Sequence, residues 1–367
     1  MTERGCDRGT LMERSGPDDG AAVDGGAGPT ARAVRVGVVF SLDAPPSSVR
    51  EYAFELALCS HLESETDWVV SRQLGGSVAA PGGRIVDVVG VVPGGGFDRR
   101  AAITAETIPP LAIESRVGVG SAVRPERAVP CAPELARRIA DDAVDVGFFE
   151  TDQRGGHRLV RRAVRYPDDW FSSLVAVENK PDLGSPGDLE SQLRTDASLA
   201  LFDRVVLATE SYVTRAHLNR IPDAVGVWRF DPETSQREIV RDPEPLSTAA
   251  TGVEPVDSHP LRTDVAFVPG EEKARIRRRV AERAYGKGWR PAPPGCAHAA
   301  VTDDGRPYCE RFDRVVDPAS DCGDGCSAFA AADPPDVDRA ALRDERTPWV
   351  ADPDGVARRQ TGLDRFS

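Results

Sequence analysis

The stretch Leu174–Gln192, LVAVENKPDLGSPGDLESQ, decides how the chain folds. Its first four residues, Leu174–Val177, have the apolar and β-branched character of a buried strand. Polar residues follow at once, at Glu178, Asn179 and Lys180. Because alternate side chains of a strand point the same way, Glu178 and Lys180 are expected to project from one face. A carboxylate and an ammonium are costly to bury there without partners, and a metal ion and a phosphate would be suitable partners.

The segments on both sides of this stretch predict alternating helices and strands. Apolar residues recur at intervals of four in EYAFELALCSHL, where Phe54, Leu58 and Leu62 mark a helix. The same kind of pattern predicts strands at 68–73, 84–92, 203–209 and 224–230 and helices near 189–200 and 213–220. The fold class is therefore α/β, with a mixed sheet flanked by helices.

Acidic side chains interrupt two of these elements. Asp87 lies within RIVDVVGVV (84–92), and an aspartate inside a buried strand is unfavourable. Either it accepts backbone hydrogen bonds in a structural role, or it binds a metal ion together with Glu178. Glu51 and Glu55 share one face of the first helix, and either form a solvated edge or contribute to the same site.

These residues suggest a specific chemistry. Asp87 and Glu178 are expected to hold Mg²⁺ (or Mn²⁺), with the backbone carbonyl of Asn179 and water completing the shell, since Mg²⁺ prefers hard oxygen ligands. The metal would acidify a bound water, and Lys180 would orient that water. The expected reaction is hydrolysis of a phosphodiester bond.

Residues 97–166 separate the two acidic strands. Helices are expected at 107–116 and 133–142, followed by two strands around Arg154-Gly155-Gly156, an arrangement that resembles a winged-helix module. The second strand has a group of arginines that either contacts DNA phosphates or is simply an exposed basic strand: Arg158, Arg161, Arg162 and Arg165. A charged helix at 270–285 likewise either lies along a duplex or is solvated.

Four cysteines cluster in the last quarter of the chain: Cys296, Cys309, Cys322 and Cys326. Four thiolates can form a closed tetrahedral Zn²⁺ site, and an iron–sulfur cluster uses the same ligands. His298 is a fifth candidate ligand, and unliganded thiols are the remaining alternative. The segment has little apolar content of its own, so a metal ion would supply much of its folding energy.

Composition places this chemistry in a particular setting. The net charge is −13, and 43 of the 46 basic residues are arginine, since lysine occurs only at Lys180, Lys273 and Lys287. High acidity with almost no lysine suggests a salt-rich cytosol, although a GC-rich genome also favours arginine. The sequence shows no secretory signal and no membrane span, so a cytoplasmic location without membrane association is expected.

The motif formed by Asp87 and Glu178-Asn179-Lys180 resembles that of the PD-(D/E)xK nucleases, which have the restriction-endonuclease-like fold. The resemblance covers about 49–96 and 167–230. It implies Glu55 as the first-helix acid, with Glu51 as fallback, and Gln192 as the helix glutamine that RecB-like and Holliday-junction-resolvase-like members carry. The whole chain also looks like an uncharacterised family from halophilic archaea.

Together these observations predict a domain plan and a function. The expected divisions are a disordered extension (1–48, with a strand at 33–42 or a native start near 49), a nuclease-like core (49–96 and 167–235), a winged-helix-like insertion (97–166), a linker and charged helix (236–290), a zinc segment (291–330) and a mobile tail (331–367). The expected function is metal-dependent DNA cleavage in repair, recombination or defence. A homodimer is the expected form if the chain assembles. The alternative is an inactive nuclease-like protein that binds DNA as a regulator.

Overall fold

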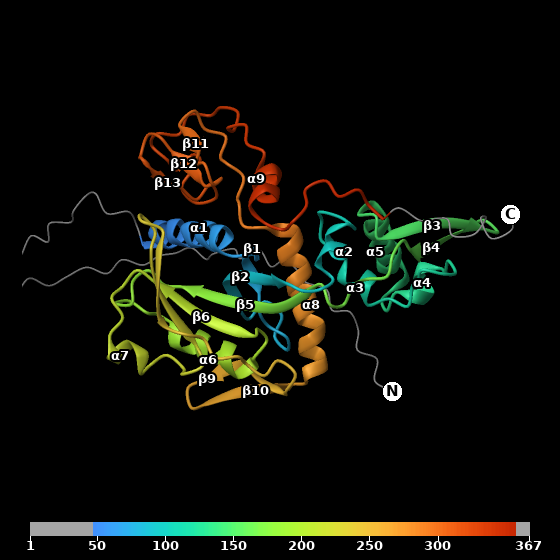
Figure 1. The fold of residues 1–367 in the computed structure, drawn as a ribbon, viewed down its shortest axis with the longest axis horizontal. Helices are drawn as coiled ribbons and strands as arrows, with labels where there is room; N and C mark the ends of the chain where they lie inside the picture. Colours follow the sequence, from blue (N-terminus) through green and yellow to red (C-terminus); the bar gives the residue numbers. More distant parts are fainter. Residues whose placement is uncertain (1–46, 357–367) are drawn as a thin grey trace, which may run out of the picture. The chain divides into compact units, whose positions relative to one another are not determined.

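A six-stranded mixed sheet forms the centre of the computed structural model, which describes residues 47–356 (Figure 1). Its strands run in the order β1-β2-β5-β6-β7-β8, and only the β5–β6 and β6–β7 pairs are parallel. The strands are β1 (Val69–Gly75), β2 (Ile85–Pro93), β5 (Phe171–Asn179), β6 (Arg204–Thr209), β7 (Gly226–Asp231) and β8 (Gln236–Arg241). The mixed α/β class expected from the alternating pattern is therefore correct.

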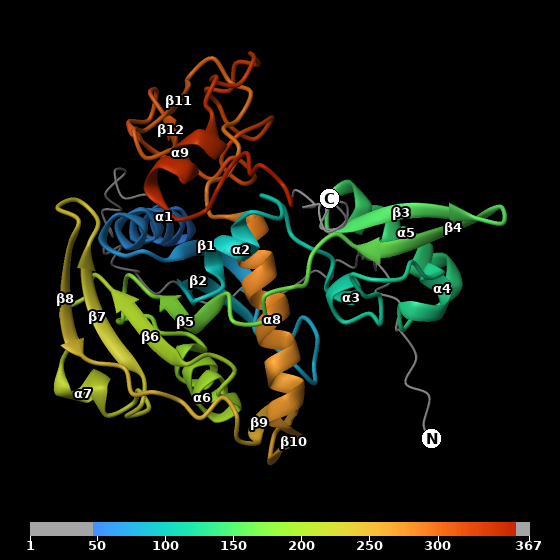
Figure 2. The same cartoon turned by 45° about the vertical axis from the view of Figure 1, so that its right-hand side comes forward.

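Helices cover both faces of this sheet (Figures 1 and 2). Helix α1 (Ser47–Glu65) buries Phe54, Leu58 and Leu62 against one face, as their spacing predicts. Helices α6 (Leu189–Leu199) and α8 (Gly270–Lys287) pack against the opposite face, and α7 (Arg215–Leu218) is a short turn between β6 and β7. None of the helices between residues 47 and 356 has the combined length and apolar content of a membrane span.

The insertion between β2 and β5 returns the chain to the same sheet, because β2 and β5 pair directly with each other. It contains α2 (Phe97–Ala101), α3 (Pro110–Ile113), α4 (Pro125–Ala128), α5 (Pro133–Asp145) and the hairpin of β3 (Phe149–Arg154) and β4 (His157–Arg162). The helix expected over 107–116 is reduced to α3, because the consecutive prolines at 109 and 110 lack the N–H groups that a longer helix needs.

A buried ion pair attaches the insertion to α8. The Arg100 guanidinium donates to both carboxylate oxygens of Glu282 at 2.7 Å, and both side chains are fully buried. The Tyr166 hydroxyl and the backbone N–H of Ile108 also donate to the Glu282 carboxylate, at 2.7 and 3.2 Å. Four donor groups from the insertion therefore meet one carboxylate of the helix.

Two segments that were expected to be irregular are ordered. The expected linker contains β8, which completes the sheet, and the hairpin of β9 (Gly252–His259) and β10 (Arg262–Val268), which packs against α6. The tail contains α9 (Arg339–Arg346), and Trp349 is buried against the ring of Tyr285. Both predictions were wrong because acidic and proline-rich composition hid short strands and one aromatic anchor.

The Cys-rich segment has a small sheet of its own, formed by β11 (Ala299–Val301), β12 (Pro307–Cys309) and β13 (Arg314–Val315). The expected disordered extension over 1–48, with its strand at 33–42, lies outside the described residues except for residues 47 and 48, at the start of α1. The last part of the expected mobile tail, 357–367, also lies outside them.

Candidate functional site

Asp87 and Glu178 lie on neighbouring antiparallel strands. Val88 of β2 pairs with Val177 of β5, so the next position outward brings Asp87 opposite Glu178. Directly opposed residues of an antiparallel pair project from the same face. The backbone N–H of Asn179 donates to Asp87 Oδ2 at 2.9 Å, which holds this carboxylate against the end of β5.

Glu55 reaches the same end of the sheet from α1. Its carboxylate accepts hydrogen bonds from the side chains of Asn179 (2.9 Å), Gln73 (2.8 Å) and Arg72 (2.5 Å). The Gln73 amide also donates to Asp87 Oδ1 at 3.3 Å, so that one side chain links the Glu55 and Asp87 carboxylates. Asn179 thus enters the site through its side chain and its N–H, whereas the sequence suggested its carbonyl.

Gln73 was not expected in the site. Its φ of +52° is in the left-handed region, which costs a residue with a Cβ on the order of 1 kcal/mol or more. Lys287 of α8 donates to the backbone carbonyls of Arg72 and Gln73, at 2.7 and 2.9 Å, and supports this turn of the backbone. Only the polar ending of the strand WVVSRQ could have drawn attention to this position.

Arg84 was also missed, and it bridges two carboxylates. One guanidinium nitrogen lies 2.5 Å from Glu178 Oε2 and 2.7 Å from Asp196 Oδ2, and the Arg84 Nε donates to Asp196 Oδ1 at 3.1 Å. All three side chains are at least nine-tenths buried. Asp196 is one helical turn after Gln192 on α6, which is the signal in the sequence that could have identified it.

Gln192 lies beside this cluster and lines a cavity. Together with Arg84 it lines an opening of about 430 Å³ whose other walls come from the 77–83 loop, from α6 and from β9. Among residues 47–356, no side-chain hydrogen bond joins Gln192 to Asp87, Glu178 or Glu55. Gln192 therefore shares a cavity wall with Arg84, the residue that contacts Glu178.

Lys180 does not lie where alternation along a strand predicts. Its ammonium is 2.5 Å from Glu51 Oε1 on α1, whereas Glu178 pairs with Arg84 on the α6 side. The expectation that Glu178 and Lys180 share a face was wrong because β5 ends at Asn179. Lys180 belongs to the loop that follows, where the two-residue period of a strand no longer applies.

Burial and like charge make the two strand carboxylates reluctant to ionise. Burial raises the pKa of Asp87 to about 6, against hydrogen bonds from Asn179 and Gln73 that lower it. Burial and the neighbouring Asp87 raise the pKa of Glu178 to about 8, although Arg84 acts in the opposite direction. Burial also raises the pKa of Asp196. A divalent cation would relieve this repulsion.

The raised pKa values predict the pH dependence of stability. The ordinary pKa values are 3.8 for Asp87 and 4.5 for Glu178. At a pH between a group's ordinary pKa and its raised pKa, the group is protonated in the folded state and ionised in the unfolded state. Each group then lowers the free energy of unfolding by up to about 1.4 kcal/mol per pH unit as the pH rises.

We therefore expect metal-free wild-type protein to lose stability, relative to Asp87→Asn and Glu178→Gln, between about pH 4 and pH 8. Urea unfolding in EDTA at several pH values measures the difference. A gap between wild type and variants that stays constant, or that changes in favour of wild type as the pH rises, would contradict the assignment.

The four clustered cysteines lie near one another. Burial raises the pKa of Cys322 to about 11, and the nearby Asp321 and the thiols of Cys309, Cys296 and Cys326 raise it further. Within residues 47–356, however, no three His, Cys, Asp or Glu side chains are arranged so that they could hold a metal ion. This applies both to the cysteines and to the acidic cluster.

Most of the arginines for which the sequence left open DNA contact or simple exposure are engaged within the protein. Arg158 pairs with Asp141, and Arg161 pairs with Glu150 at 2.9 Å. Arg162 donates to three backbone carbonyls, those of Ala112, Ile113 and Ser115. Arg165 is exposed. Two of these four arginines are therefore paired with carboxylates, and a third is occupied by backbone carbonyls. On α8, Arg279 is paired with Glu114 at 2.7 Å.

Comparison with known families covers most of this architecture. Residues 69–331 match the model of a family of unknown function, DUF5787. The chain belongs to the DUF5787 family. The part matched by DUF5787 begins at the start of β1, includes the insertion and ends shortly after Cys326. It therefore contains Asp87, Glu178 and Arg84, while Glu55 precedes it. Neither the curated proteins nor the solved structures gave a match.

Proposed function

We propose that this chain is a metal-dependent nuclease that hydrolyses phosphodiester bonds of DNA. One observation carries the proposal: Asp87 and Glu178 face each other on adjacent strands, both with pKa values raised by burial and, for Glu178, by the neighbouring carboxylate. Two such carboxylates are a suitable anchor for Mg²⁺ or Mn²⁺, which retain several water ligands and need few from the protein.

The surrounding residues suit this chemistry. Asp87 and Glu178 would hold the ion, which when bound supplies an acidified water and positive charge for the phosphate. Glu55 orients Gln73 and Asn179, and through them fixes the Asp87 carboxylate. Arg84 donates hydrogen bonds to Glu178, Asp196 and the backbone carbonyl of Ile85, and so holds the Glu178 carboxylate in place beside the cavity.

The order of elements supports a restriction-endonuclease-like core. A helix and two antiparallel strands precede the insertion, and a strand, a helix and a parallel strand follow it, with the acidic pair at one end of the sheet. The insertion adds helices followed by a hairpin, in the manner of a winged helix. The proposed roles are DNA repair, recombination or defence in a salt-rich cytoplasm. The proposed assembly is a homodimer.

A second candidate is a catalytically inactive nuclease-like protein that binds DNA as a regulator. Two contacts favour it: Arg84 already pairs with Glu178 and Asp196, and the Lys180 ammonium is paired with Glu51. In this case the positive charge next to Glu178 comes from the Arg84 guanidinium and not from a metal ion, so the protein would not cleave DNA.

A cleavage panel separates the two candidates. Purified full-length protein is incubated with single-stranded, duplex and branched DNA, in high salt, with Mg²⁺ or Mn²⁺ and with EDTA. The nuclease proposal predicts cutting of at least one substrate with metal and none in EDTA. Binding of DNA without cutting under all conditions supports the regulator.

The four cysteines form a proposed second metal centre. Their donor set suits Zn²⁺, an iron–sulfur cluster is the alternative, and the mutual effect of the thiols on the pKa of Cys322 supports their proximity. We expect elemental analysis to give about one zinc per chain, since four thiolates fill one tetrahedral site. The double variant Cys322→Ser/Cys326→Ser should lose this zinc.

Three results bear on this prediction. The same measurement on Cys59→Ser, a buried cysteine on α1, should be unchanged. Iron together with visible absorption would replace zinc by an iron–sulfur cluster. Absence of both metals would leave the thiols unliganded.

A further inference from the structure

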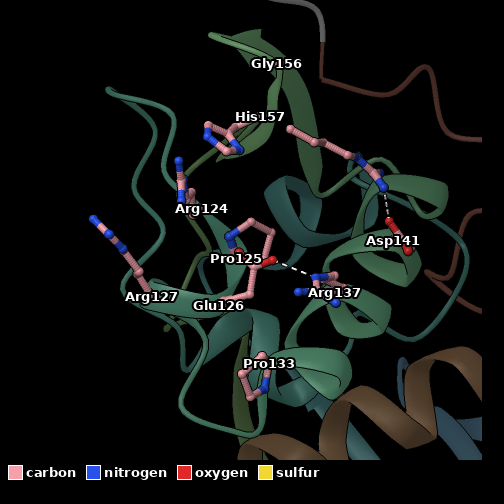
Figure 3. A pocket seen from close by; sticks show the side chains of 10 residues that line it. Arg124, Pro125, Glu126, Arg127, Pro133, Arg137, Asp141, Gly156 and His157 are labelled. Atoms are coloured by element: carbon pink, nitrogen blue, oxygen red, sulfur yellow. Dashed lines mark hydrogen bonds and ion pairs between the residues drawn. The ribbon is translucent and has the colours of Figure 1, made fainter.

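A pocket of about 600 Å³ lies within the insertion, where α4, the start of α5 and the β3–β4 hairpin meet (Figure 3). Four arginines line it, at Arg124, Arg127, Arg137 and Arg158, and His157 stands at the hairpin end. The carboxylates in its wall are Glu126 and Asp141. The pocket therefore has two more arginines than carboxylates, in a chain whose net charge is −13.

Two of the arginines are neutralised and two are available. Arg137 pairs with Glu126 at 2.6 Å, and Arg158 pairs with Asp141. Arg124 and Arg127 have no carboxylate within ion-pair distance in the described part of the chain, and Arg127 is exposed to solvent. Within the described residues, the arginines of this pocket that have no ion-pair partner thus lie on the four-residue span from Arg124 to Arg127.

Backbone contacts fix the position of this span. Val123 exchanges two hydrogen bonds with Val160 of β4, at 2.9 and 2.8 Å, so that Arg124 directly follows a bridge to the hairpin. The hairpin turns at Gly155 and Gly156, whose φ values of +58° and +76° are those that a two-residue loop between strands requires. Arg124 and His157 therefore border one opening, as Figure 3 shows.

We propose that this pocket binds the phosphodiester backbone of DNA, which makes it a second contact surface for the proposed nuclease. The inference takes its ligand class from that function. Guanidinium groups bind phosphate oxygens in pairs of hydrogen bonds, and the pocket wall contains no phenylalanine, tyrosine or tryptophan ring on which a base could stack. Contacts of this kind position a protein on DNA without reading its sequence.

The pocket also differs from the basic strand that the sequence emphasised. Arg161 and Arg162 are occupied within the insertion, whereas Arg124 and Arg127 lie on a segment, RPERA, that carries no strong sequence signal. Its size exceeds what a single phosphate group fills, so several consecutive phosphates of a strand are a better match than a free phosphate ion.

DNA binding by full-length protein in EDTA tests the inference, because no metal-dependent cutting then occurs. Fluorescence anisotropy of a labelled duplex is followed over a range of salt concentrations for wild type and for Arg124→Ala/Arg127→Ala. We expect the double variant to bind about tenfold or more weakly, and the slope of log K against log salt to become less negative by about two, one per lost phosphate contact.

The matched control is Arg215→Ala/Arg220→Ala, which removes two exposed arginines near α7 that do not line this pocket. It should leave the slope unchanged. Inorganic phosphate is included as a competitor, and displacement of the duplex by low phosphate would show a small-anion site, which overturns the proposal.

Failure of this inference can be told from failure of the proposed function. If the double variant binds DNA as wild type does, the pocket assignment is overturned, whether or not the protein cuts DNA with Mg²⁺. If binding depends on Arg124 and Arg127 but no DNA is ever cut, the pocket assignment stands and the nuclease proposal fails. If wild type binds no DNA, the pocket assignment is overturned.

Discussion

Asp87→Asn and Glu178→Gln are each expected to reduce DNA cleavage by on the order of 10³-fold or more, since either change removes a ligand and a charge that the reaction requires. Asparagine and glutamine keep the shape of the side chain, so the folded structure should persist. Rates under single-turnover conditions with Mg²⁺, at DNA concentrations that saturate each protein, measure the loss.

The matched control for these variants is Glu190→Gln. Glu190 lies on α6 close to the site in sequence, but its carboxylate is exposed and, within residues 47–356, forms an ion pair with Arg194 alone, one turn along the same helix. Its replacement should leave cleavage unchanged. Cleavage by both site variants at the wild-type rate would contradict the assignment of Asp87 and Glu178.

Stability supplies an internal check on the same variants. The raised pKa of Asp87 means that its charge destabilises the metal-free folded protein at neutral pH. Asp87→Asn should therefore be at least as stable as wild type in EDTA while losing activity. Replacing a residue that serves function at the expense of stability lowers activity without lowering stability. Replacing an aspartate with a structural role would lower stability.

Glu282→Gln is expected to lower the free energy of unfolding by about 3–5 kcal/mol, the largest effect on stability that the structure predicts. The change leaves the Arg100 guanidinium buried without a counter-charge, and it weakens the acceptor shared by Tyr166 and Ile108. Urea unfolding gives the value. Because the ion pair joins the insertion to α8, loss of order in 97–166 should accompany the change.

The comparison variant for Glu282 is Glu238→Gln on β8. Glu238 also pairs with an arginine, Arg229, at 3.6 Å, but its side chain is 66% exposed, and pairs of this kind contribute less than about 1 kcal/mol. An effect of Glu282→Gln as small as that of Glu238→Gln would show that the buried pair does not hold the insertion to the core.

Periodicity predicted the parts of the fold that bury continuous apolar surface. The four-residue spacing of Phe54, Leu58 and Leu62 identified α1. The apolar run that Asp87 interrupts identified β2, and the apolar run that ends before Glu178 identified β5. An acidic residue inside such an apolar run is costly to bury unless it has a partner. For that reason the sequence alone suggested that Asp87 and Glu178, far apart in the chain, would lie together.

The residues that complete the site could not be read in this way. Arg84 stands just before a strand and looks like any exposed arginine, yet it is buried against Glu178. Gln73 acts through a left-handed backbone conformation that no pattern specifies. Lys180 was misplaced because the end of β5 could not be located to within one residue, and one residue reverses the face.

Contacts over long sequence separations were equally invisible. Arg100 and Glu282 are 182 positions apart, and neither lies in a motif. The pairing of β7 with β8 was hidden by the acidic and proline-rich composition of the residues that follow β7. The buried Arg100–Glu282 pair and the β7–β8 pairing both depend on tertiary packing, which cannot be predicted from local sequence propensity.

The proposed function depends on one divalent ion held jointly by Asp87 and Glu178, and titration with Mn²⁺ followed by electron paramagnetic resonance measures that binding. We expect about one tight Mn²⁺ per wild-type chain at this site, since the two facing carboxylates anchor a single ion. We also expect the dissociation constant to be raised about tenfold or more in both Asp87→Asn and Glu178→Gln, and Glu190→Gln to bind as wild type does. Wild-type protein that binds no Mn²⁺, or site variants that bind it as tightly as wild type, would rule out a metal site at Asp87 and Glu178.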